Sequence, residues 1–475
     1  MSPAPFDLSI SEMGAALRGG RLSSATLVES ALSRIADYDS HLKAFIRVDA
    51  PGALQAAHQA DRELANGYDR GPLHGVPYAI KDICDVAGEP TTCNSRVRAG
   101  HVAQSDSTVV ERMRTAGAIL LGKLNLTEFC TGGPGDEWPH PPPRNPWNTA
   151  HITGGSSSGA GVAVAARYIR LAIGTDSGGS LRLPAAYCGG VGFKPTFGRV
   201  SHKGIFPLSE SLDHCGPLAR SVEDAAIGLQ AIAGFDPADR LSSNVPVGDY
   251  IGSLRLGVRG LRIGIPADHF NLIDHLDPAV AASLDRTRCS LADAGAIVTT
   301  VSLPDLGAFR AAGMAIMLAE AFAVHREDLR TRLTSYSQET AQRFLQGAGV
   351  SQADLTYAWR HRRRLTQSID RIFQSCDVIL TASTVSGAGM IGSMGDMMAT
   401  PRRIALLPFN VTGHPAIHVP MSTDSSGLPV GVQLVSARFA EETLLRAASF
   451  VEACGAWPRI AFPALDKSAE EPTRI

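Results

Sequence analysis

The chain has 475 residues, of which 44% are hydrophobic and 19% charged, and its formal net charge is −2. This balance argues against nucleic acid as the main partner, because a phosphate-binding surface needs an excess of Lys and Arg. The low charged fraction also excludes an intrinsically disordered chain. At roughly 150 residues per domain the length suggests about three domains, although a large α/β enzyme can reach this size as one unit.

The eight cysteines include no Cys-x-x-Cys pair and no Cys/His cluster at zinc spacing. Scattered free thiols are typical of a reducing compartment. The first ten residues, MSPAPFDLSI, lack the basic and apolar regions of a signal peptide, and the apolar runs are too short and interrupted to span a bilayer. We therefore expect a cytoplasmic protein that uses no metal and no cofactor.

The first 70 residues predict helices. Ser9 and Glu12 form a capping-box pattern, and the helix that follows should end at a glycine pair. Further helices are expected from residue 24 to about 39 and from about 54 to 65, where apolar residues recur at helical spacing.

From residue 75 onward, strands and helices alternate. Strands are predicted at 76–80, 118–123 and 171–175, and helices at 108–116 and 159–168. This alternation predicts an α/β fold, with a single large domain whose central twisted mixed β-sheet is covered by helices on both faces.

The second half of the chain continues the pattern without a clear linker. We expect helices at 222–233, 277–294, 306–330 and 440–454, and strands at 261–265, 296–301, 377–381, 415–420 and 429–436. The predicted organisation is one domain over 1–475, with N-terminal helices in 1–70, a core at about 71–224, a variable region at about 235–400 and a C-terminal core at about 401–460.

Two runs rich in Gly and Ser, 154–159 (GGSSSG) and 174–182 (GTDSGGSLR), adjoin strongly apolar segments. Such runs on their own are more often turns or linkers. The second, however, puts a serine at the end of a strand, where α/β sheets bind ligands. The first also matches the Gly-x-Ser-x-Gly elbow of α/β-hydrolases, but no hydrophobic strand precedes it as that motif requires.

Six of the 44 basic residues are lysines, and Lys81 directly follows an apolar run. A lysine held against apolar surface loses hydration, which favours its neutral form and lets it act as a general base. The alternative is a strand-end lysine whose ammonium group reaches water, and position alone favours that reading. Ser40-x-x-Lys43 matches a motif of penicillin-binding enzymes, but the accompanying motifs are missing.

Five segments in order resemble the amidase signature family of serine hydrolases, and the resemblance covers nearly the whole chain. They are GPLHGVP with Lys81-Asp82 (71–82), GGSSSG (154–159), GTDSGGSLRLPA (174–185), CGGVGFKPTFG (188–198) and SLDHCGPLARS (211–221). The resemblance implies a Ser–cis-Ser–Lys triad, in which Ser180 is the nucleophile, Ser156 the bridging serine and Lys81 the base. It also implies a cis peptide before Ser156.

The same resemblance assigns roles around the nucleophile. It implies an oxyanion hole formed by backbone N–H groups of Ser177, Gly178 and Gly179 together with that of the nucleophile. Asp176 and Arg182 are expected to brace this loop by hydrogen bonds. Ser177 stands where an aliphatic residue or Thr is frequent in the family, which affects the expected substrate rather than the triad.

Two segments, 131–149 and 387–400, are expected to line the substrate pocket. The candidate contacts are Thr131, Gly132, Gly133, Trp138, Met390, Met394 and Asn410. The second segment has four methionines, whose flexible side chains suit a pocket that adapts to several apolar shapes. Alternatively, these methionines only pack an irregular loop.

We therefore expect a stand-alone amidase that cleaves C–N bonds of small apolar or aryl amides through an acyl-enzyme on Ser180. Candidate activities are those of aryl acylamidases and of carbamate and hydrazide hydrolases. The expected partner is a small amide-type substrate, with no nucleic acid and no membrane, and the expected state is a monomer or homodimer.

The alternative within the family is the glutamine-hydrolysing subunit of an aminoacyl-tRNA amidotransferase, which releases ammonia for a partner subunit. That role needs charged groups that hold the α-amino and carboxylate groups of glutamine. Arg402 and Arg403 are available for the carboxylate, but no acidic partner is evident in the sequence nearby.

Overall fold

The computed structural model describes residues 4–131, 135, 137–268, 272–392, 405–455 and 457. Within these ranges, eleven strands form one sheet in the order β1-β3-β2-β4-β6-β5-β10-β11-β9-β7-β8. The strands are β1 Phe45–Val48, β2 Pro77–Lys81, β3 Ile119–Leu124, β4 Leu171–Thr175, β5 Val191–Lys194, β6 Cys215–Ala219, β7 Arg262–Pro266, β8 Ile297–Val301, β9 Val378–Ala382, β10 Ala416–Thr423 and β11 Pro429–Ser436.

The sheet is mixed. β2 runs parallel to β3 and β4, and β7 runs parallel to β8 and β9, whereas the other neighbouring pairs are antiparallel. Central strands such as β4 and β11 are buried along their whole length, which explains why apolar residues predominate in both and why β4 is almost entirely apolar.

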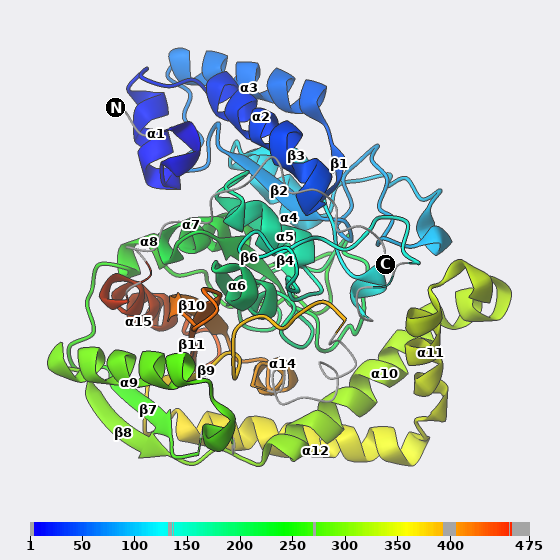
Figure 1. Cartoon of the computed structure of the whole chain (residues 1–475), viewed down its shortest axis with the longest axis vertical. Helices are drawn as coiled ribbons and strands as arrows, with labels where there is room; N and C mark the ends of the chain where they lie inside the picture. The colour runs from blue at the N-terminus through cyan, green and yellow to red at the C-terminus, as the bar shows by residue number, and fades with distance from the viewer. Residues whose placement is uncertain are drawn as a thin grey trace.

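Helices cover both faces of this sheet (Figure 1). They are α1 Ile10–Arg18, α2 Ser24–Leu42, α3 Ala50–Ala65, α4 Thr108–Thr115, α5 Ser158–Ala165, α6 Arg182–Cys188, α7 Val222–Ile232, α8 Tyr250–Ser253, α9 Pro278–Asp293, α10 Leu306–Thr331, α11 Gln338–Gln346, α12 Gln352–Ile372, α14 Pro408–Val411 and α15 Glu441–Cys454. Because side chains alternate across a strand, Tyr78 and Ile80 of β2 join one buried cluster and Ala79 joins another. The predicted fold class is therefore confirmed.

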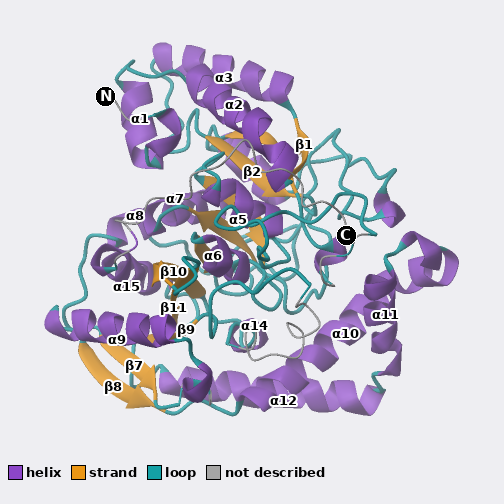
Figure 2. Ribbon diagram, in the orientation of Figure 1, coloured by secondary structure: helices purple, strands orange, loops and turns teal. Residues whose placement is uncertain are grey.

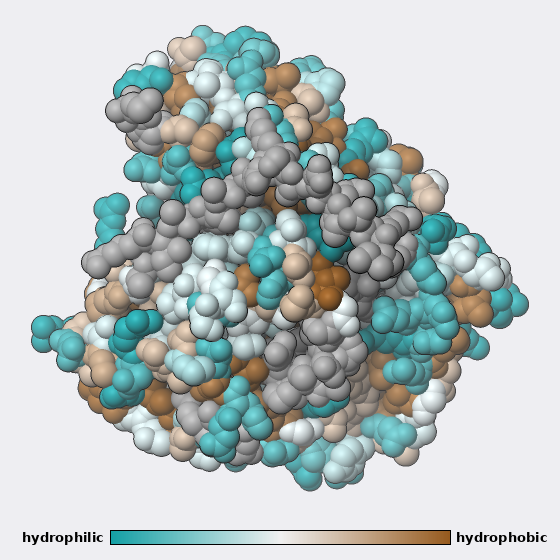
Figure 3. Space-filling view, viewed as in Figure 1, coloured by the Kyte–Doolittle hydropathy of each residue, from teal (hydrophilic) through white to brown (hydrophobic). Residues whose placement is uncertain are grey.

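Distant parts of the chain meet around the sheet. Helices α1 to α3 gather at one end of the molecule and α9 to α12 at the other (Figure 1), while the C-terminal α15 packs against α7 and α8. Loops are concentrated between these two groups (Figure 2). The face in Figure 3 mixes hydrophilic and hydrophobic surface, without one large apolar area among the described residues.

Local signals placed most predicted elements to within a few residues. Helix α1 starts with the expected capping box, in which the Ser9 N–H donates to Glu12 Oε2 at 2.7 Å and Ser9 Oγ accepts from the Glu12 N–H at 3.2 Å. The sequence analysis missed β5 and β6, because their VGFK and CGPLA sequences contain Gly and Pro, which are depleted in strands. It also missed α12, whose buried apolar residues are few: Ala358, Leu365 and Ile369.

Helix α10 is an exception to the expectation that no segment could span a bilayer. Its length and apolar composition alone are sufficient for a membrane span. In the structure it packs against α11, α12 and α14. Two polar residues on it are hydrogen-bonded, Glu320 to Ser209 and His325 to Tyr336.

Candidate active site

Lys81 lies at the carboxyl end of β2, next to the end of the parallel strand β4. It is completely buried. Its Nζ lies 2.8 Å from Ser156 Oγ and 2.9 Å from Thr175 Oγ1. The Gly155–Ser156 peptide is cis, as the family resemblance implied. Thr175 was missed as a site residue, although its position at the end of a strand parallel to the lysine strand could have indicated it.

Ser157 joins the two serine-containing segments. Its Oγ donates to the Thr175 carbonyl at 3.0 Å and accepts from the Thr175 N–H at 3.3 Å. Its own N–H donates to the Ser180 carbonyl at 3.2 Å. These bonds hold the segment that precedes α5 against the loop that follows β4. Ser157 therefore fixes the positions of Ser156 and Ser180 relative to each other.

Ser180 is the most accessible of the three proposed catalytic residues, with 8% exposure against 2% for Ser156 and none for Lys81. Within the described part of the chain, the Ser180 hydroxyl forms no hydrogen bond. The relay from lysine to nucleophile is therefore not closed between the two serine hydroxyls in this conformation. Catalytic hydrogen bonds commonly tighten only when substrate binds.

A buried ion pair supports the nucleophile loop. Asp176 and Arg182 are both completely inaccessible, and Arg182 Nε and Nη2 each donate to the Asp176 carboxylate at 2.9 Å. Burial raises the pKa of Asp176, but the charge and hydrogen bonds of Arg182 outweigh that effect, so its pKa lies below the ordinary value. A plain surface role for Arg182 is excluded.

The backbone of the nucleophile loop packs closely against Leu406 and leaves several of its N–H groups free in the described part of the chain. Gly179 has φ +120°, and a Cβ at this position would lie 2.6 Å from Leu406 Cδ1, so only glycine fits here. Its N–H donates to Asp176 Oδ1 at 2.6 Å. The N–H groups of Ser177, Gly178 and Ser180 have no acceptor among the described residues and remain available to a bound oxyanion.

Asp213 holds the start of the same loop. Its Oδ1 accepts from Ser177 Oγ at 2.5 Å, and its Oδ2 accepts from the backbone N–H groups of Leu208 and Ser209 at 2.9 and 3.1 Å. Burial raises the pKa of Asp213 to about 6. The sequence analysis assigned no role to Asp213, although it lies in one of the matched segments.

A charged pair from α10 and α12 reaches the same region. Arg362 Nη2 donates to the Ser211 carbonyl at 2.7 Å, and the Ser211 N–H donates to Glu320 Oε2 at 3.2 Å. Arg362 Nε also donates to the carbonyl of Val411 at 2.8 Å. Two unlike charges thus meet at one residue of the loop that leads to Asp213. Neither charge was predicted as a site residue, because only the tertiary structure brings these helices to Ser211.

The expected substrate contacts are distributed unevenly. Thr131 and Trp138 are buried, Met390 is 59% exposed, and Asn410 is completely buried. The Asn410 amide donates to Asp176 Oδ1 at 2.8 Å and accepts from Arg182 Nη2 at 2.7 Å, which places it beneath the nucleophile loop. The other expected residues, Gly132, Gly133, Met394, Arg402 and Arg403, lie outside the described residues.

A second lysine near the site is part of a buried ion pair. Lys123 Nζ lies 2.8 Å from Asp82 Oδ1, and both side chains are almost inaccessible. Lys81, by contrast, has no carboxylate partner in the described part of the chain. Removal of Lys123 would therefore leave a buried carboxylate without its counter-ion, whereas removal of Lys81 would not.

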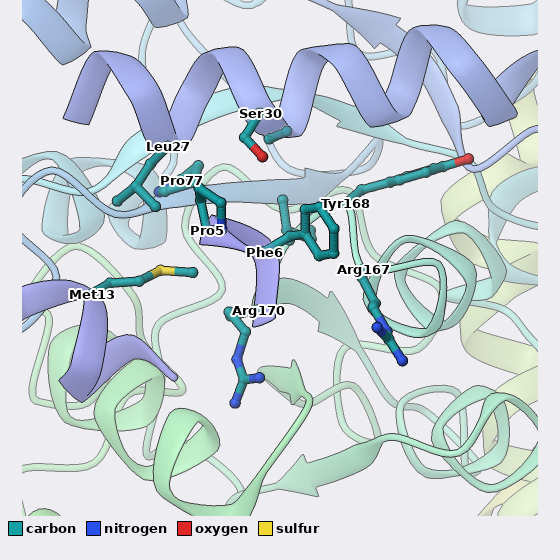
Figure 4. Close-up of a pocket in the computed structure, with 11 residues that line it drawn as sticks. Pro5, Phe6, Met13, Leu27, Ser30, Pro77, Arg167, Tyr168 and Arg170 are labelled. Carbon is teal, nitrogen blue, oxygen red and sulfur yellow. The ribbon is translucent and has the colours of Figure 1, made fainter. Parts of the chain in front are cut away.

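A small cavity lies away from this site, below α2 and near the N-terminal end (Figure 4). Residues such as Phe6, Leu27 and Tyr168 line it, and its volume is about 10 Å³. That is room for about one water molecule, so it is not a substrate site. No group of three or more His, Cys, Asp or Glu in the described ranges could hold a metal ion.

Comparison with known proteins places the site in a family context. A model of the Amidase family matches residues 26–445. The glutamyl-tRNA(Gln) amidotransferase "A" chain of Geobacter metallireducens is 38% identical, and the match covers 95% of this chain and 98% of that relative. A structure described as a vestigial protein complex that reveals the evolutionary origins of an s-triazine catabolic enzyme matches with a TM-score of 0.88, 32% identity and coverage of 96% and 100%. The peptide amidase of Stenotrophomonas maltophilia matches with a TM-score of 0.85, 32% identity and coverage of 98% and 100%.

These findings correct two expectations. The prediction of a stand-alone hydrolase of small apolar or aryl amides is wrong, because the relatives that match nearly the whole chain are named as amidotransferase subunits. The expectation of a monomer or homodimer without nucleic acid is wrong for the same reason. The near-neutral net charge of this chain therefore did not exclude a nucleic-acid partner.

Proposed function

This chain belongs to the Amidase family, and we propose that it is the glutamine-hydrolysing subunit of an amidotransferase that acts on glutamyl-tRNA(Gln). The observation that carries the proposal is the charged pair Arg362 and Glu320 on Ser211, two residues before Asp213, whose carboxylate accepts from Ser177 of the nucleophile loop. The relatives named as glutamyl-tRNA(Gln) amidotransferase subunits, at 38% identity, support the same reading.

The charged pair matches the head group of glutamine. A free amino acid presents a carboxylate and an ammonium group, so its site needs one cation and one anion close together. Burial lowers the pKa of the Arg362 guanidinium and nearby Glu320 raises it, but an arginine stays protonated at neutral pH. Arg362 Nη1 and Glu320 Oε1 have no hydrogen-bond partner in the described residues, so Arg362 can donate to the carboxylate of the ligand and Glu320 can accept from its ammonium group.

The catalytic step uses the buried lysine and the two serines. In its neutral form, Lys81 accepts the proton of Ser156, which accepts the proton of Ser180 as Ser180 Oγ attacks the side-chain amide carbon of glutamine. The N–H groups of Ser177 and Gly178, with that of Ser180, stabilise the oxyanion. Gly179 donates to Asp176 here and contributes by shaping the loop. Loss of one oxyanion donor typically costs about 3–4 kcal/mol of transition-state stabilisation.

Collapse of the tetrahedral intermediate breaks the C–N bond. The relay returns a proton through Ser156 to the leaving nitrogen, and ammonia departs while the γ-glutamyl group stays on Ser180. Water then attacks the acyl-enzyme by the same route and releases glutamate. Asp176, Arg182 and Asn410 act below the loop as positioning residues, because their side chains are buried and bonded to one another.

The test is glutamine binding and hydrolysis by the purified chain. Ammonia release from glutamine is compared with release from propionamide, which lacks both charged groups. Binding to the Ser180→Ala variant is measured by calorimetry, so that the result does not depend on turnover. Arg362→Gln should weaken glutamine binding about 10- to 100-fold, because a hydrogen bond to a charged group contributes about 1.5–3 kcal/mol.

Arg330→Gln is the matched control, since Arg330 lies on α10 in an exposed pair with Glu327. It should leave glutamine binding unchanged. A higher kcat/KM for propionamide than for glutamine would overturn the proposal. So would an Arg362→Gln variant that binds glutamine as tightly as its parent.

A further inference from the structure

The outer side of α12 carries a row of arginines. Arg360, Arg363, Arg364 and Arg371 are all exposed, whereas the apolar residues of this helix are buried in its packing against α10. At 100° per residue the four arginines lie within an arc of about 100°, opposite the buried face. Helix α12 runs along the lower edge of the molecule in Figure 1.

The row is not neutralised. Among the described residues none of the four arginines forms an ion pair, although the nearby Arg262 and Arg438 do. The two acids of α12 are otherwise engaged: Asp354 caps the helix through Ser351, and Asp370 accepts from Arg438. The positive charge of the row is therefore presented to solvent.

A polar groove continues the row at the C-terminal end of α12. It has a volume of about 630 Å³ and lies between this helix and the residues around the end of β8. Arg371 is on its wall, together with the hydroxyl-bearing residues Ser302, Ser368 and Ser375. Arginine guanidinium and serine hydroxyl groups are the donors that proteins commonly direct at phosphate oxygens.

An aromatic residue adjoins the other end of the row. Tyr357 is 63% exposed, and its ring centre lies 4.2 Å from that of His361. On the helix it is three residues before Arg360 and seven before Arg364, so it borders the same surface. An exposed aromatic ring next to arginines is a platform on which a nucleic-acid base can stack.

We propose that the outer face of α12 and the adjoining groove bind the phosphate backbone of RNA. The four arginines span eleven residue steps, about 16 Å of helix, which matches a linear series of phosphates. A membrane-binding helix would add large apolar residues to its basic face, and this face has Gln, Ser and Thr instead. The inference deepens the proposed function by giving an RNA partner a contact on this chain, and it rests on that function only for the choice of probe.

The test measures binding of a fluorescein-labelled tRNA(Gln) transcript to the full chain by fluorescence anisotropy, without glutamine. The variant is Arg360→Gln/Arg363→Gln/Arg364→Gln. The control is Arg21→Gln/Arg240→Gln/Arg255→Gln, which removes the same charge from three arginines that are exposed and unpaired among the described residues. Thermal unfolding midpoints of both variants are compared with that of the wild type to check folding.

A plot of the logarithm of the RNA association constant against the logarithm of salt concentration falls with a slope of about 0.9 per phosphate contact. Four contacts therefore predict that wild-type affinity falls about 150-fold between 50 and 200 mM salt. The affinity of the α12 variant, which keeps only one of the four contacts, should fall only about 3- to 4-fold over the same salt range. The affinity of the control should fall as much as that of the wild type. Equal salt dependence in all three proteins would refute the proposal. Tighter binding to polyglutamate or to anionic lipid vesicles than to RNA would also refute it. Because no turnover is measured, failure here is distinguishable from failure of the glutaminase proposal.

Discussion

Replacement of Asp176 by Asn tests how the nucleophile loop is supported. The Asp176 carboxylate accepts from Arg182 Nε and Nη2 at 2.9 Å each, from the Gly179 N–H at 2.6 Å and from Asn410 Nδ2 at 2.8 Å. Asparagine keeps the shape of the side chain but removes its charge and replaces one acceptor oxygen by a donor. Arg182 is then left buried without a counter-ion, and one set of donors faces an amide nitrogen.

The expected loss follows from the burial of the pair. Removing one partner of a buried ion pair typically costs about 3–5 kcal/mol. With an unfolding entropy of about 2.1 cal/mol/K per residue, a chain of 475 residues has a total of about 1 kcal/mol/K. The midpoint of thermal unfolding should therefore fall by about 3–5 °C. The kcat/KM for glutamine should fall at least about 100-fold, because a misplacement of about 1 Å can cost that much.

The assay is calorimetric unfolding at one fixed scan rate, since large chains often unfold irreversibly, together with ammonia release from glutamine. Asp285→Asn is the matched control, because it breaks an Asp–Arg pair whose side chains are 68% and 44% exposed. Exposed pairs contribute little, so its midpoint should not move. If both variants shift the midpoint equally, the reasoning from burial is wrong.

Four further variants test the site and its surroundings. Ser180→Ala should abolish glutamine turnover at an unchanged unfolding midpoint, and retained activity would rule out this nucleophile. Lys81→Met should lower kcat about 10²- to 10⁴-fold with little loss of stability, since no described carboxylate pairs with it. Lys123→Met should instead lower the unfolding midpoint, because it leaves the buried Asp82 unpaired; equal midpoints for the two lysine variants would contradict this. Asp213 has a pKa of about 6 in the folded chain, against about 3.9 unfolded, so its contribution to stability is full below about pH 4 and lost as pH rises through 6. The midpoint of wild type minus that of Asp213→Asn should therefore decrease between pH 4 and 6, and a constant difference would exclude this titration.

Much of the fold could be predicted because its signals are local. The capping box of α1 uses two residues three positions apart, and β4 is a continuous apolar run that is buried on both faces. The elements that were missed depend on distant neighbours. β6 contains Pro217 yet pairs with β4 and β5, and α12 is stabilised by its packing on α10 rather than by a strong apolar stripe.

The proposed catalytic residues could also be predicted from the sequence, because Lys81, Ser156 and Ser180 each lie in a short segment that resembles a family motif. The choice between substrates was not. Under the proposed function it depends on Arg362, which lies 182 positions after Ser180 (362 − 180) and donates to the Ser211 carbonyl. It also depends on Glu320, which accepts from the Ser211 N–H.

The sequence by itself therefore predicted the α/β class, most element positions and membership of the Amidase family, and it supplied the lysine and serines of the proposed catalytic site, since each of these follows from neighbouring residues. The tertiary structure alone decided that Arg362 and Glu320 meet at Ser211 and which arginines of α12 are exposed. Electrostatic contacts act through space over a few ångströms, and their partners are far apart along the chain.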